Sequence, residues 1–154
     1  MRLPKFSTKA LNRFSKEDGS ASLEFITAGM LLLIPLVYLV VAVGAVQGAT
    51  LATEGAARQA ARVYVESPDR DTAVKRAQQA IDFALADYGL DSKQADVTIN
   101  CSDTCLTPQS LVSIGVGVKV VMPLVPAVLN LDQAAVVPVS SQASQVVSRF
   151  HGVR

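Results

Sequence analysis

The sequence has few of the side chains on which catalysis and nucleic-acid binding depend. It contains one histidine, no tryptophan, five phenylalanines and three tyrosines. A single histidine without a serine or carboxylate constellation beside it gives no support for an active site. So few aromatic rings argue against a base-stacking platform. The formal net charge of +1 leaves no basic patch for a phosphate backbone. We therefore expect a protein that is not an enzyme and does not bind nucleic acid.

Metal-ligating and phosphate-binding patterns are equally scarce. Cys101 and Cys105 are the two cysteines, and His151 is the one histidine. Two thiols and a distant imidazole are too few for a typical zinc site, and a C-x3-C spacing is not the C-x-x-C of redox enzymes. The chain also lacks a glycine-rich phosphate loop. We expect neither a metal nor another cofactor.

Charge is missing from a long internal stretch as well. No charged residue lies between Glu24 and Glu54. A bilayer core of about 30 Å needs roughly 20 apolar residues in a helix, and the segment from Phe25 to Val46 supplies them. A carboxylate such as Glu24 at the edge of such a segment is costly unless a partner neutralises it. The sequence thus predicts a membrane span with an unusual charge at its N-terminal end.

The flanks of this span predict its orientation. The arm before it carries five basic residues against two acidic ones: Arg2, Lys5, Lys9, Arg13 and Lys16, with Glu17 and Asp18. An excess of Lys and Arg favours the cytoplasmic side, so the rest of the chain is expected outside the cytoplasm. Ala42-Val43-Gly44 could serve as a signal-peptidase site, but the apolar run before it is longer than that of a removable signal peptide.

A basic arm, Gly19, four residues, Glu24, Phe25 and an apolar helix together resemble the prepilin motif of type IV pilins and pseudopilins. Within that group the chain is most similar to the TadE-like minor pilins or pseudopilins of tight-adherence (Flp-type) pili. The resemblance covers roughly residues 10 to 66. Major subunits of these pili usually have Glu-Tyr and are much shorter, so Phe25 and the large C-terminal part indicate a minor component.

The resemblance implies a processing step and a set of partners. A prepilin peptidase would cut between Gly19 and Ser20, and Glu24 with Phe25 would form the assembly motif. The partners would be other pilin or pseudopilin subunits, the inner-membrane assembly platform and membrane lipid. The subunit would be a single-pass inner-membrane protein that enters the pilus or primes its assembly. The alternative is an unprocessed anchored domain that binds an extracytoplasmic partner.

Small residues recur at every fourth position from Gly44 onward. One such row allows another helix to approach closely: Gly44, Gly48, Ala52, Ala56 and Ala60. The alternative is that this alanine-rich helix packs on its own domain. A polar row at the same spacing is expected to be a solvated face with i,i+4 ion pairs: Glu54, Arg58, Arg62 and Glu66.

A second helix is predicted after residue 66. Ser67 is the candidate N-cap, Pro68 fits the first helical position, and Gly89 is the candidate stop. Apolar residues at helical spacing predict its core face: Val74, Ala77, Ile81, Ala84, Leu85 and Tyr88.

Strict alternation of apolar and polar residues predicts strands over 96–101 and 112–122. Gly115 and Gly117 could mark a bulge or close packing against a helix. A third strand is expected over 134–141, where Pro138 indicates an edge. The tail over 142–150 continues this strand or forms a short helix.

These elements predict an α+β, pilin-like fold with a long N-terminal transmembrane helix, a second helix and a small antiparallel sheet. The expected organisation is a basic leader over 1–19, a transmembrane and stalk helix over 20–66, and a small extracytoplasmic domain over 67–154. Outside the cytoplasm disulfides persist, so we expect Cys101 and Cys105 to form one, although three intervening residues make the geometry demanding.

Overall fold

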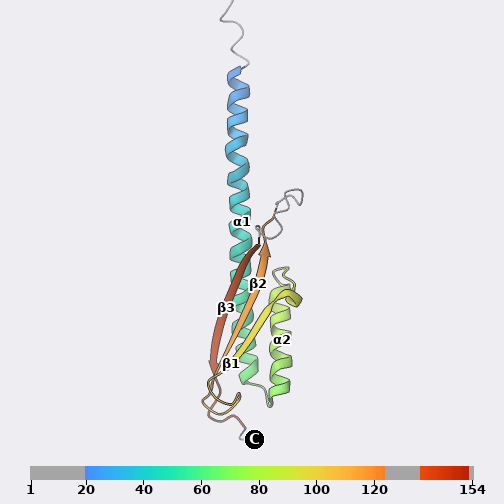
Figure 1. The fold of residues 1–154 in the computed structure, drawn as a ribbon, viewed down its shortest axis with the longest axis vertical. Helices are drawn as coiled ribbons and strands as arrows, with labels where there is room; N and C mark the ends of the chain where they lie inside the picture. The colour runs from blue at the N-terminus through green and yellow to red at the C-terminus, as the bar shows by residue number, and fades with distance from the viewer. Residues whose placement is uncertain (1–19, 124–135, 153–154) are drawn as a thin grey trace, which may run out of the picture. The chain divides into compact units, whose positions relative to one another are not determined.

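The structure is a computed structural model that describes residues 20–123 and 136–152, and the chain divides into two units, Met1–Val40 and Val41–Arg154. The elements (Figure 1) are α1 (Ser20–Val65), α2 (Arg70–Ala86), the short 3-10 helix η2 (Ser92–Gln94), β1 (Asp96–Cys101), β2 (Leu111–Val121) and β3 (Val136–Val146). The predicted α+β class, with a long helix, a second helix and an antiparallel sheet, is confirmed.

The part of α1 in the second unit carries a stripe of buried, mostly small side chains. It consists of Ala49, Ala52, Thr53, Ala56, Ala57, Ala60, Ala61 and Tyr64. The alanines and Tyr64 share one core with α2 and the sheet. Small side chains let the helix axis lie close to its neighbours, and the Thr53 hydroxyl lies 3.0 Å from that of Ser141 in β3. The helix is thereby fixed against the sheet both by close packing and by one polar contact.

The polar row of α1 lies on its exposed side. Arg58 pairs with Glu54, and Arg62 pairs with Glu66 at 3.2 Å, each with i,i+4 spacing. This confirms the predicted solvated face with ion pairs. Exposed pairs of this kind contribute between 0 and about 1 kcal/mol each, so they do not determine where the helix packs.

The N-cap of α2 differs from the prediction. Asp69, not Ser67, caps the helix, because its carboxylate accepts the Thr72 backbone N–H at 2.9 Å. Ser67 is buried, and its hydroxyl donates to the Val63 carbonyl at the end of α1. Pro68 consequently precedes the cap and does not occupy the first helical position.

The other end of α2 matches its predicted stop. Gly89 has φ +70°, and the Leu90 N–H donates to the Leu85 carbonyl while the Gly89 N–H donates to that of Ala86. This is the bonding pattern of a Schellman motif, which favours glycine at the left-handed position. The predicted core face was partly wrong: Val74 and Tyr88 are exposed, and the buried residues are Ala73, Ala77, Ile81 and Leu85.

The cap predicts a pH dependence of stability. Hydrogen bonds from the Thr72 N–H and hydroxyl lower the pKa of Asp69. A folded-state pKa below the unfolded value means that the stabilisation is complete above about pH 4 and is lost as pH falls through the folded pKa. Asp69→Asn should remove this part of the acid dependence of the urea midpoint. Asp71→Asn, a neighbouring carboxylate outside the cap, should retain it, and identical acid slopes for the two variants would contradict the assignment.

The sheet has the order β1-β2-β3, and both pairs are antiparallel (Figure 1). In β2, every second side chain is buried in the common core with the helices: Val112, Ile114, Val116, Val118 and Val120. The strands predicted over 96–101 and 112–122 are therefore confirmed, with β2 ending at Val121. Period-2 alternation is the expected pattern for a sheet covered on one face.

The two glycines of β2 lie on the face turned away from the helices. The register runs without a break through Gly115 and Gly117, so neither marks a bulge, and neither packs against a helix. A Cβ atom at Gly115 would lie 2.6 Å from the Thr98 hydroxyl oxygen of β1. Glycine at 115 thus accommodates a neighbouring side chain on the sheet's outer face.

β3 extends beyond its predicted end at residue 141. It pairs with β2 from Val136↔Val121 to Val146↔Leu111, so the first part of the predicted tail continues the strand. Pro138 lies on this outer strand of the sheet, as predicted. The predicted residues 134 and 135 fall outside the described residues.

Candidate functional site

The first described segment of α1, from Ala21 to Val40, presents apolar side chains that nothing in its own unit covers. Phe25 is 79% exposed and Leu32 is 73% exposed. The helix is long and apolar enough to cross a membrane by length and composition. The Thr27 hydroxyl donates to the Leu23 carbonyl at 2.7 Å, so its polar group is satisfied within the helix.

Glu24 is the one charged residue in this segment, and its side chain is exposed. Phe25 follows it on the same turn of α1. Among the described residues no ion pair includes Glu24. Gly19, the other half of the motif, lies outside the described residues, and Ser20 is described only as part of the helix. Glu24 is thus a single carboxylate near the start of an apolar helix.

The residues of the predicted helix-packing row differ in how far they are buried. Ala52, Ala56 and Ala60 are buried in the core of the second unit, so they already pack against their own domain. Gly44 is exposed and Gly48 is half-buried, with a Tyr88 ring carbon 3.9 Å from the place of a Cβ atom. Gly44 and Gly48 thus remain the part of the row that a second helix could approach.

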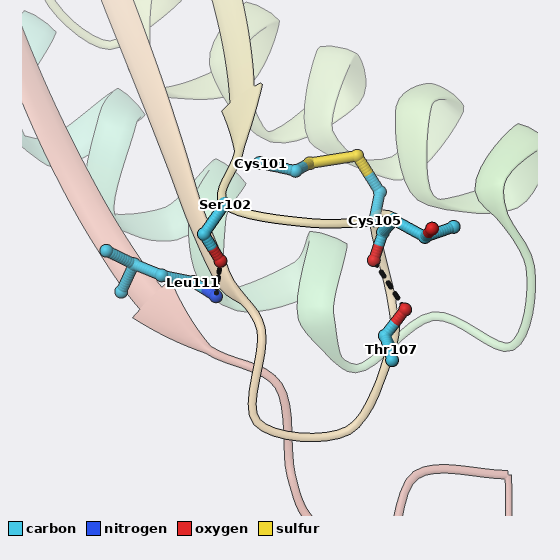
Figure 2. Close-up of a disulfide and its surroundings, with 6 residues drawn as sticks. Cys101, Ser102, Cys105, Thr107 and Leu111 are labelled. Carbon is cyan, nitrogen blue, oxygen red and sulfur yellow. Dashed lines mark hydrogen bonds between the residues drawn. A yellow bond between two sulfur atoms is a disulfide. The ribbon is translucent and has the colours of Figure 1, made fainter.

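A disulfide joins Cys101, at the end of β1, to Cys105 in the loop that leads to β2 (Figure 2). The two Cα atoms are 5.5 Å apart, within the usual range for such a bridge. Ser102 holds the loop to β2, because its N–H donates to the Leu111 carbonyl and its hydroxyl accepts the Leu111 N–H. The Thr107 hydroxyl donates to the Thr104 carbonyl at 2.7 Å.

The remainder of this loop contains features that the sequence analysis missed. Leu106 is buried, and both Leu106 and Gln109 have positive φ, at 70° and 67°. Ser110 is buried with no hydrogen-bond partner for its hydroxyl among the described residues. A lone leucine in a polar loop was the one available signal, because the left-handed backbone at non-glycine residues leaves no pattern in the sequence.

The bridge should stabilise the domain by a modest amount. It closes a loop of only five residues, for which chain entropy gives about 2 kcal/mol. We expect no thiol labelling of the protein isolated without reductant, and a lower urea midpoint after reduction. The double variant Cys101→Ser/Cys105→Ser should match the reduced protein and be insensitive to reductant. Two labelled thiols in the unreduced protein would contradict the bridge.

Groups of three or more His, Cys, Asp or Glu side chains that could hold a metal ion are not found within residues 20–123 and 136–152. The expectation that the chain needs no metal or other cofactor stays a prediction. Comparison with known proteins adds no family: no protein-family model, curated protein or solved structure matches the chain.

Proposed function

We propose that the chain is a pilin-like minor subunit, a pseudopilin, that a prepilin peptidase processes and that takes part in assembling a tight-adherence pilus or a related secretion machine. The observation that carries the proposal is Glu24 on an exposed apolar helix, five residues after Gly19 and directly before Phe25. A simple membrane anchor needs an apolar helix and a basic flank, but it does not need a carboxylate at the mouth of the span.

Cleavage after Gly19 would give Glu24 a partner. The new N-terminus at Ser20 is an amine, and the carboxylate of one copy can neutralise the amine of a neighbouring copy in an apolar environment. An unpaired charge there costs several kcal/mol, so pairing favours the correct axial position of each added subunit. Glycine before the cut suits a protease cleft, since it adopts an extended backbone readily and has no side chain to exclude.

The second unit fits the outward part of such a subunit. Its elements form one small core, and its disulfide is of the type that persists outside the cytoplasm. The excess of basic residues before Gly19 favours a cytoplasmic N-terminus. In this proposal the apolar helix packs among those of other subunits in the membrane or the fibre, and the α+β domain faces outward.

The mass of the membrane-purified protein tests the proposal. The chain is expressed with and without its prepilin peptidase, beside a matched Gly19→Val variant. We expect a peptidase-dependent species that begins at Ser20, and no such species from Gly19→Val. An intact chain in every case would favour the unprocessed anchored domain that binds an extracytoplasmic partner. A product that begins near Ala45 would identify an ordinary secreted protein.

A further inference from the structure

Both outer strands of the sheet leave one edge without a strand partner among the described residues. The order β1-β2-β3 places β1 on one side of β2 and β3 on the other (Figure 1). Each open edge presents backbone N–H and C=O groups, which is why unprotected edges readily pair with another strand. Neighbouring hydrogen bonds show which residues supply these groups.

On β3, the even-numbered residues point their backbone groups outward. Val147, one residue beyond the strand, donates to the Ser110 carbonyl and accepts the Gln109 N–H, so its groups point toward β2. Backbone groups alternate in direction along a strand. Ser140, Gln142 and Ser144 consequently direct their N–H and C=O groups to the open edge.

On β1, the odd-numbered residues point outward. Ser102, one residue beyond this strand, donates its N–H to the Leu111 carbonyl at 2.9 Å. By the same alternation Val97, Ile99 and Cys101 direct their backbone groups away from β2. Their side chains lie on the helix-covered face, whereas those of Ser140, Gln142 and Ser144 lie on the outer face.

The β3 edge lacks most of the features that protect natural edge strands. Over Val136–Val146 the strand has no charged residue, and its register with β2 has no bulge. Pro138 protects one end only, by removing a single N–H. On β1, Asp96 is the one charged residue. Long, neutral and regular edges are usually avoided unless they are used.

We propose that β3 of one copy pairs with β1 of a second copy, so that the sheets of successive copies join edge to edge. β1 and β3 are both antiparallel to β2, so they run in the same direction and would form a parallel pair between two copies of the same orientation. In a parallel pair, a residue whose N–H and C=O both point toward the neighbouring strand bonds to two residues of that strand. The residue directly opposite it lies between these two and directs its own N–H and C=O away from the pair. The even-numbered residues of β3 and the odd-numbered residues of β1, whose backbone groups point to the open edges, can bond to each other in this way. The helix-covered faces of the two sheets then lie on the same side.

The direction of the strands selects this pairing over a twofold pair. An antiparallel β3–β3 contact would turn the Val41 ends of two copies in opposite directions, whereas copies anchored in one membrane start from the same side. This step rests on the common membrane orientation in the proposed function. A contact between two different edges is heterologous, so it repeats from copy to copy and gives an open series unless the rotation between copies closes a ring.

Cysteine crosslinking of the full-length chain in membranes tests the contact. Two differently tagged copies are co-expressed, one with Thr98→Cys or Asn100→Cys on β1, the other with Ser140→Cys, Gln142→Cys or Ser144→Cys on β3. We expect a mixed-tag dimer for at least one combination under mild oxidation. Ser113→Cys on the central strand is the matched control and should give none.

Two outcomes would overturn the proposal. One is the absence of a mixed-tag dimer in every combination. The other is a same-tag dimer from Gln142→Cys alone, which indicates twofold pairing. The mass of the protein in the same samples shows whether the chain begins at Ser20. A failure of the edge contact can thus be distinguished from a failure of the proposed processing.

A charge on the edge provides an independent test. The hydroxyls of Ser113 and Ser144 lie 2.6 Å apart on the outer face. Ser144→Lys and Ser113→Lys therefore break the same hydrogen bond and add the same charge, but only the first does so on the edge strand. We expect Ser144→Lys to reduce the crosslinking of Gln142→Cys with its β1 partner at least tenfold, and Ser113→Lys to leave it within twofold. Equal loss in both variants would contradict the edge contact.

Discussion

Glu24→Gln should leave the protein inserted in the membrane but abolish its incorporation into an assembly. Glutamine keeps the size of the side chain and removes the charge, so insertion of the apolar helix becomes no harder. In the proposed function, the amine of Ser20 on the neighbouring copy then has no counter-charge. Breaking an ion pair in an apolar setting costs about 3–5 kcal/mol, equivalent to between about a hundredfold and a few thousandfold in association.

The matched control is Glu54→Gln on the same helix. Glu54 pairs with Arg58 on the exposed side of α1, where such a pair contributes at most about 1 kcal/mol. Membrane fractionation measures insertion, and co-purification with the other subunits measures assembly. Normal assembly of Glu24→Gln and of Glu24→Ala would show that charge pairing is not the role of this carboxylate.

The regular elements were predictable because their side-chain periods are strong. Alternation over 96–101 and 112–122 predicted β1 and β2, and α1 extends over the predicted residues from Ser20 to about Val65. Gly89 was predictable as a stop because few other residues adopt a left-handed backbone without strain. In each case a local rule and the packed structure favour the same conformation.

Where several local rules competed, packing decided the outcome. Ser67 was the predicted N-cap, but its hydroxyl bonds to the end of α1, and Asp69 caps α2 in its place. Serine and glutamine, frequent in the second half of β3, do not favour a strand by themselves. Pairing with β2 extends β3 to Val146. Such tertiary effects are not visible in a single sequence.

The candidate site was predictable to a different extent in each part. Glu24 and the apolar run stand out in sequence because a charge is rare there. The sequence did not show which surface the row of small residues packs against. Close packing on another subunit and close packing on the chain's own domain require the same small residues. In the structure Ala52, Ala56 and Ala60 are buried in the chain's own core, so this part of the row packs on its own domain.

This alanine-rich surface makes the domain unusually dependent on one large side chain. Tyr64 ends the buried stripe of α1, is 1% exposed, and is the largest fully buried side chain among the described residues. The alanines before it contribute little apolar area each, so the ring supplies a large share of what α1 buries. Tyr64→Ala should destabilise the second unit by about 3–5 kcal/mol, as large-to-small changes of buried aromatic residues do.

Two variants separate the loss of the Tyr64 ring from other effects. Tyr64→Phe keeps the ring and removes the hydroxyl, so it should cost less than about 1.5 kcal/mol. Phe83→Ala truncates an aromatic residue of α2 that is 74% exposed, and it should change stability by no more than about 0.5 kcal/mol. Urea unfolding of the detergent-solubilised chain, followed by circular dichroism, measures all three. Equal urea midpoints for Tyr64→Ala and Phe83→Ala would mean that the Tyr64 ring is not packed in the core. The close packing of α1 against the sheet would then need another cause.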